Sequence, residues 1–117
     1  MENENASFFE VWTAIKQSDE LLTATERWVL TVMVGHCNFH HSDGSFIWPS
    51  DRTIATQAGF GARTVRACRR KFRQIGLLEW TKVQGAPNRT FVDLDAILEL
   101  PEKARSFRRQ SNEQENP

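Results

Sequence analysis

Hydrophobic side chains recur at the spacing of helices in some segments of the chain and in short extended runs in others. Phe8, Trp12 and Ile15 are spaced i, i+4 and i+7, which predicts an amphipathic helix over residues 7–17. Thr23 and Glu26 can form a capping box at the start of a second helix. We expect that helix over about residues 24–40, with an apolar side made of Val29, Val32, Met33 and either His36 or Cys37.

The middle of the chain predicts a short strand and then two helices. The apolar segment 46–48 is expected to be extended, because a proline follows Trp48. Ser50 is a favourable N-cap for a helix over residues 51–58. After a tight turn at residues 59–61, a longer helix is predicted over residues 62–75, with an apolar face of Val65, Cys68, Phe72 and Ile75.

The last third predicts a β-hairpin and a polar tail. Gly76 is expected to end the preceding helix in a left-handed conformation. Residues 77–82 and 89–94 predict two short strands, joined by a loop over residues 83–88. A last helical turn is expected before Pro101. Beyond it lies a basic cluster, which is either a solvated tail or an arm on the phosphate backbone: Lys103, Arg105, Arg108 and Arg109. The polar end, residues 111–117, is expected to be disordered.

The segment that begins at Asp51 meets the stereochemical requirements of a helix-turn-helix. Counting Asp51 as the first position, Ala55 is the fifth, where a small side chain lets two helices cross closely. Gly59 is the ninth, in the turn, where positive φ favours glycine, and the branched Val65 is the fifteenth. The other positions expected to be buried hold Ile54, Ala58, Phe60 and Cys68. With the hairpin, this predicts a fold that is mainly α with a small β-hairpin, a winged helix-turn-helix.

The same region resembles the winged helix-turn-helix domain of plasmid and phage replication proteins and of related small bacterial DNA-binding regulators. The motifs that carry the resemblance are Trp48-Pro49-Ser50, Thr53-Ile54-Ala55, Gly59, Arg63-Thr64-Val65-Arg66 and Ile75-Gly76-Leu77-Leu78. It covers about residues 21–94 and implies a winged-helix fold that binds DNA. The family usually has Ser before the second helix of the motif, where this chain has Gly61. Gly is a weaker N-cap than Ser by roughly a few tenths of a kcal/mol, and it lacks a hydroxyl that could contact phosphate.

The chain of 117 residues has room for one domain with short extensions. We therefore divide it into an N-terminal amphipathic helix at residues 1–20, for packing or dimerisation, and a winged helix-turn-helix domain at residues 21–100. A basic and then disordered tail is expected at residues 101–117.

Charge is balanced overall and uneven locally. Fifteen basic residues match fifteen acidic ones. Residues 1–30 carry six acidic and two basic side chains, a net charge of −4, whereas residues 61–92 carry eight basic and one acidic, a net charge of +7. Since salt screens charges beyond about 10 Å, a local positive field can act within a neutral protein.

The arginine-rich helix is the candidate DNA reader. At 100° per residue, Arg63, Arg66 and Arg70 lie opposite its apolar face, where arginine can pair bidentately with guanine in the major groove, and Ala67 allows close approach. Arg69, Lys71 and Arg73 flank the apolar face. Residues expected to contact phosphate are Ser50, Thr53, Gln57, Thr64 and Lys71, and in the wing Lys82, Asn88 and Arg89 are candidates for a minor groove or phosphates.

Metal binding and catalysis find little support in the sequence. The neighbouring His36, Cys37, His40 and His41 invite a metal site, and His36 and His40 share a helical face. A structural zinc site needs four ligands, however, and only Cys68, which belongs to the apolar core face, is left to complete the set. No nucleophile elbow, phosphate-binding loop or pair of acids appears, so neither an enzyme nor a cofactor is expected. Trp28, Trp48 and Trp80 are expected to pack within the protein rather than to stack on bases.

The location expected for the protein is the cytoplasm, at the nucleoid. Cys37 and Cys68 belong to no CxxC pair, and no signal-peptide pattern is found, which favours a reducing compartment. The longest apolar run falls short of the ~18 residues that indicate a membrane span.

The leading interpretation is a small transcriptional regulator that binds double-stranded DNA sequence-specifically, as a repressor or control factor of a mobile element. Two alternatives stay open: a plasmid or phage replication protein that binds origin repeats, and a winged helix that docks an acidic protein partner. The oligomeric state is also open. Phe8, Phe9, Trp12 and Ile15 either cover the domain core or form a homodimer interface, which would suit a palindromic site with half-sites about 34–36 Å apart.

Overall fold

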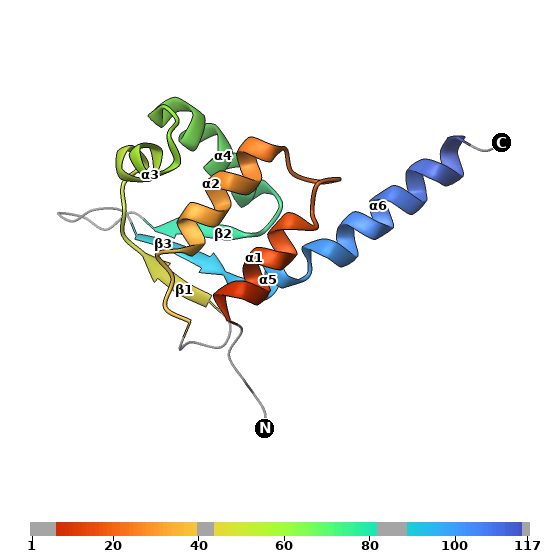
Figure 1. Ribbon diagram of the computed structural model, residues 1–117, viewed down its shortest axis with the longest axis horizontal. Helices are drawn as coiled ribbons and strands as arrows, with labels where there is room; N and C mark the ends of the chain where they lie inside the picture. The colour runs from red at the N-terminus through yellow and green to blue at the C-terminus, as the bar shows by residue number, and fades with distance from the viewer. Residues whose placement is uncertain (1–6, 40–43, 82–88, 116–117) are drawn as a thin grey trace, which may run out of the picture.

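The computed structural model of the protein describes residues 7–39, 44–81 and 89–115 (Figure 1). Its helices are α1 (Phe8–Lys16), α2 (Ala24–Val34), α3 (Asp51–Ala58), α4 (Ala62–Gln74), α5 (Leu94–Leu98) and α6 (Leu100–Glu115), and its strands are β1 (Gly44–Ile47), β2 (Leu78–Thr81) and β3 (Arg89–Asp93). The protein is therefore mainly helical with a small antiparallel sheet, as predicted, and the arrangement is compatible with a winged helix-turn-helix.

The sheet has the order β1-β3-β2, with both pairs antiparallel. The predicted hairpin of β2 and β3 is confirmed, and β1 adds a third strand by pairing Phe46 with Phe91. Burial alternates along β3, where Thr90 and Val92 are buried and their neighbours are partly exposed. One face of the sheet therefore lies against the core.

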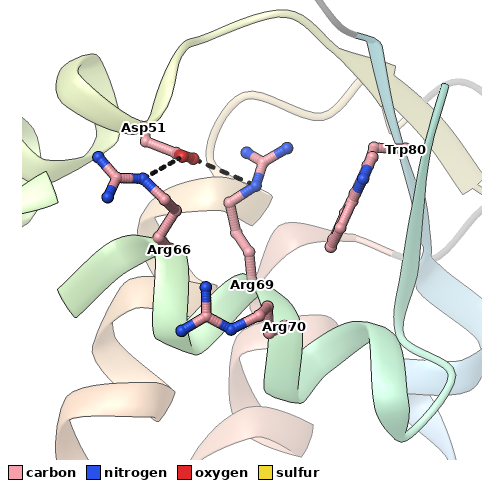
Figure 2. Close-up of a pocket in the computed structure, with 5 residues that line it drawn as sticks. All are labelled: Asp51, Arg66, Arg69, Arg70 and Trp80. Carbon is pink, nitrogen blue, oxygen red and sulfur yellow. Dashed lines mark ion pairs between the residues drawn. The ribbon is translucent and has the colours of Figure 1, made fainter. Parts of the chain in front are cut away.

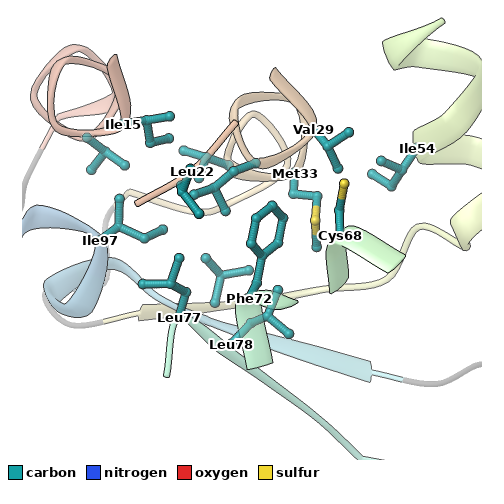
Figure 3. Close-up of a cluster of buried hydrophobic side chains, with 14 of the residues drawn as sticks. Ile15, Leu22, Val29, Met33, Ile54, Cys68, Phe72, Leu77, Leu78 and Ile97 are labelled. Carbon is teal, nitrogen blue, oxygen red and sulfur yellow. The ribbon is translucent and has the colours of Figure 1, made fainter. Parts of the chain in front are cut away.

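The core forms where α1, α2, α3, α4 and α5 meet that face of the sheet (Figure 3). Phe72 of α4 lies among Leu22, Met33 and Leu77, and all four side chains are buried. Full burial of one such side chain contributes about 1.5–3 kcal/mol. Because Val11 and Ile15 of α1 belong to the same cluster, the N-terminal helix packs with the helix-turn-helix segment as one unit.

Local capping explains where several helices begin. Thr23 and Glu26 form the predicted capping box, and Ser7 and Glu10 form a second one at α1. The Ser50 hydroxyl accepts a hydrogen bond from the backbone N–H of Thr53, as expected for an N-cap of α3.

The second helix is shorter than predicted. It ends at Val34 with Gly35 as its C-cap, rather than near residue 40. Glycine disfavours a helix by about 1 kcal/mol relative to alanine, which is the physical reason for the early end. Consequently His36 is exposed and Cys37 is only partly buried, so neither belongs to the buried side of the helix.

The predicted disorder near the C-terminus is wrong at least as far as Glu115. Pro101 lies in the first turn of α6, where its missing N–H costs no intrahelical bond. The next fourteen residues include no further proline or glycine and are rich in Glu, Arg and Gln, which favour helix. Leu100 and Ala104 anchor the start of α6 in the protein, and the rest of the helix extends away from the body (Figure 1).

Candidate nucleic-acid interface

The candidate site is built on α3, α4 and the turn between them. Gly59 has a φ of 82°, the left-handed conformation predicted for it, and its N–H donates to the Ala55 carbonyl over 2.8 Å. Ile54 and Ala55 of α3 and Val65 of α4 are buried at the place where the two helices meet. Phe60 was expected to be buried too, but it stays on the outside of the turn with 37% of its surface exposed.

The two faces of α4 differ in the way its sequence predicted. Val65, Cys68 and Phe72 are buried, while Ile75 follows the helix as its C-cap and is partly buried. Arg63, Arg66 and Arg70 are exposed, and the small Ala67 is exposed among them. Four of the predicted contact residues therefore share one accessible basic surface, which we call the α4 face: Arg63, Arg66, Ala67 and Arg70.

Thr64 and Lys71 lie away from the α4 face. Thr64 is only partly exposed. The Lys71 ammonium donates to the Leu21 carbonyl over 3.3 Å and lies 3.4 Å from a Glu26 carboxylate oxygen at the start of α2. Lys71 therefore links α4 to α2, and its expected phosphate contact competes with this ion pair.

The predicted contacts on α3 are exposed but partly engaged within the protein. Ser50 caps the helix, and its hydroxyl lies 3.2 Å from that of Thr53. The Gln57 Oε1 atom lies 2.7 Å from the His36 Nε2 atom. All three predicted residues are exposed, with Ser50 and Thr53 near the start of α3 and Gln57 near its end.

The wing is described only in part. Lys82 and Asn88, two predicted contacts, lie outside the described residues. Arg89 at the start of β3 is partly buried, and its guanidinium lies 4.2 Å from the centroid of the Phe46 ring and 5.9 Å from that of Trp48. Cation–π contact with two aromatic rings holds Arg89 against the sheet.

A charged network that the sequence did not predict lies beside the α4 face. Asp51 places one carboxylate oxygen 3.5 Å from Arg66 Nε and the other 3.2 Å from Arg69 Nε (Figure 2). Arg69 also donates from Nη2 to the Thr90 hydroxyl of β3. The network joins α3, α4 and the sheet. Its three charged members line an open pocket of about 280 Å³ together with Arg70 and Trp80.

Arg69 is the buried member of this network. It was expected to flank the apolar face, but only 9% of its surface is exposed. Burial lowers the pKa of its guanidinium, and the negative charge of Asp51 partly opposes that effect. On the inner face of the same helix, burial raises the pKa of the Cys68 thiol, and the nearby Glu26 carboxylate adds to the rise.

The tryptophans do not all pack as predicted. Trp80 is partly buried, with the Arg73 guanidinium 4.4 Å from its ring centroid. Trp28 and Trp48 are about half exposed, although the Trp28 indole N–H donates to the Ala58 carbonyl at the end of α3.

The residues of α1 that were expected at a dimer interface differ in their exposure. Ile15 is buried in the core and therefore cannot line such an interface. Trp12 is partly buried under the Lys16 ammonium, which lies 3.9 Å from its ring centroid. Phe8 and Phe9 are exposed at the start of α1, and the role of that apolar surface stays a prediction.

The described residues contain neither a metal cluster nor a membrane-spanning helix. Among them, no group of three or more His, Cys, Asp or Glu side chains is placed to hold a metal ion. In the same residues, no helix combines the length and the hydropathy that crossing a membrane requires.

No protein-family model matches the chain, and the searches of curated proteins and of solved structures find no significant match.

Proposed function

We propose that this protein binds double-stranded DNA sequence-specifically and acts as a small transcriptional regulator. The observation that carries the proposal is the α4 face. Three arginines stand exposed on the outer side of a helix whose inner side is buried, directly after a short helix and a glycine turn. A helix presented in this way fits the major groove of B-DNA, and arginine fits the O6 and N7 atoms of guanine.

The sequence resemblance, whose motifs include Arg63 and Arg66 themselves, also favours DNA and suggests a second function. Because the resemblance includes replication proteins, the second candidate function is binding to repeated origin sequences rather than to an operator. The third possibility, an acidic protein partner, rests on the same positive charge. The three possibilities differ in what the protein selects, so one experiment separates them.

The test is selection of bound fragments from the genome that encodes the protein, followed by sequencing. A regulator is expected to enrich sites near promoters, with paired half-sites if it works as a homodimer. An initiator is expected to enrich direct repeats at one origin. If no fragment is enriched above an unselected pool, DNA recognition is refuted and the protein-partner function takes its place.

A further inference from the structure

Asp51 stands between two arginines that are three residues apart on α4. Its two carboxylate oxygens divide between them, so that each arginine is met at its Nε atom (Figure 2). The two arginines differ in accessibility, since 56% of the Arg66 side chain is exposed but only 11% of the Arg69 side chain. Arg69 is fixed a second time by Thr90 of β3. Asp51 is therefore anchored on its inner side and presents its remaining oxygen to the exposed Arg66.

Contact at Nε leaves the outer end of the Arg66 guanidinium free. Figure 2 shows its two terminal nitrogens directed away from Asp51. Those two nitrogens are the parallel donors that a guanine edge accepts. A flexible arginine loses rotamer freedom when it binds, and an arginine already held at Nε loses less.

The other two arginines of the α4 face lack this support. Among the residues that the structure describes, no carboxylate lies within ion-pair distance of Arg63 or Arg70. They are therefore freer to meet either a base or a phosphate. The carboxylate of Asp51 has the opposite effect on general attraction, because a negative charge near the interface repels the phosphate backbone.

We propose that Asp51 is a positioning residue that directs Arg66 to a guanine, so that Arg66 sets the sharpest base preference of the protein. This inference rests on the proposed DNA-binding function. The carboxylate of Asp51 thereby weakens the general attraction to DNA and strengthens the discrimination at one base pair.

The test measures affinity for the selected duplex and for duplexes in which each guanine in turn is replaced by adenine. Arg66→Lys keeps the charge but loses the planar fork, so discrimination at one guanine should fall roughly 5- to 150-fold. Asp51→Asn should lower discrimination at that same guanine by roughly 2- to 12-fold, the ordering cost of one side chain. Its affinity for unrelated DNA should stay equal or rise.

Two controls make the result specific. Glu79→Gln, which removes a carboxylate 2.8 Å from Arg73, gives the same change in charge away from Arg66 and should leave guanine discrimination unchanged. In the Arg66→Lys background, Asp51→Asn should cause no further loss at that guanine, because Asp51 acts through Arg66. Thermal denaturation checks that each variant folds. If Asp51→Asn does not fold, Asp51→Glu replaces it, because glutamate keeps a negative charge for the buried Arg69 but moves the carboxylate relative to Arg66.

The outcomes separate the two claims. If the wild type prefers its site but Asp51→Asn discriminates equally well, the positioning role is refuted and the proposed function stands. The role is refuted too if the losses at Asp51 and Arg66 map to different base pairs or simply add. If the wild type shows no base preference at all, sequence-specific binding itself fails, and the positioning role with it.

Discussion

At the scale of single residues, the binding capacity of the α4 face depends on which arginines of the helix are not engaged by partners within the protein. Arg69 is buried and ion-paired, Arg73 lies 2.8 Å from Glu79, and Arg66 is held at one atom only. The charge of a residue is therefore a poor guide to its role on this helix. What decides the role is how much of the guanidinium remains accessible once its partners within the protein are satisfied.

Arg63→Ala and Arg66→Ala test the readout directly. Each change should cost about 1–3 kcal/mol of binding free energy on a selected site and relax preference at one base pair. Fluorescence anisotropy on the selected duplex and its single-base variants measures both quantities. Unchanged affinity together with unchanged base preference would remove these two residues from the interface.

The exposed arginines could be predicted from the sequence, and the network beside them could not. Helical periodicity places Arg63, Arg66 and Arg70 on one side of α4 because they share that helix with Val65 and Phe72. The Asp51–Arg69–Thr90 link joins a helix, a second helix and a strand, and no period along the chain relates those residues. The burial of Arg69 was not predicted for the same reason. Asp51 and Thr90 contact its Nε and Nη2 atoms, and helical periodicity had placed the residue only at the edge of the apolar face.

At the scale of elements, the turn between α3 and α4 contains two glycines with different roles. Gly59 has a positive φ of 82°, whereas Gly61 has an ordinary extended φ of −81° as the N-cap of α4 and makes no side-chain capping bond. A Cβ atom at either position would meet no heavy atom within 4 Å. Backbone conformation and capping therefore decide the effect of a substitution at each.

Gly59→Ala and Gly61→Ser should change stability in opposite directions. Gly59→Ala should lower the free energy of unfolding by about 1–2 kcal/mol, because a Cβ atom is strained in the left-handed region. Gly61→Ser should raise it by roughly a few tenths of a kcal/mol, since a hydroxyl can cap α4. Urea denaturation of both variants beside the wild type measures the difference. Equal effects would contradict the assigned backbone roles.

The boundaries of helices were predicted correctly where the sequence has strong capping residues. Ser50, Gly59 and Gly76 delimit elements where predicted. The end of α2 was predicted wrongly, because Gly35 was passed over as a helix end. The helical turn expected before Pro101 is present as α5, but α6 was not predicted, because Pro101 was taken as the end of helical structure and instead lies in the first turn of α6. Both errors concern residues that are compatible with either side of a helix boundary.

At the scale of the whole molecule, the proposed binding to DNA requires a local positive field, because the chain as a whole is neutral. The net charge is zero, but Arg63, Arg66 and Arg70 are gathered on one helix face. The acidic residues Glu20 and Glu26 are engaged elsewhere, with Arg108 of α6 and with Lys71. Binding should therefore depend on a limited number of phosphate contacts.

A salt series measures that number. With about 6 phosphate contacts, the logarithm of the association constant should fall with the logarithm of salt concentration at a slope near −5. Titrations of the selected duplex at several salt concentrations yield the slope. A slope near zero would mean that phosphates contribute little, and the electrostatic part of the proposal would be lost.

The central claim is that the α4 face reads DNA, and one comparison of variants tests it most directly. The variant Arg63→Ala/Arg66→Ala/Arg70→Ala removes the face, and Lys103→Ala/Arg105→Ala/Arg109→Ala removes the same charge from exposed positions of α6. The measurement is affinity for the selected duplex relative to a scrambled one. The first variant should lose the preference for the selected duplex, and the second should keep it. If both variants keep the preference, or lose it equally, the α4 face is not the reader.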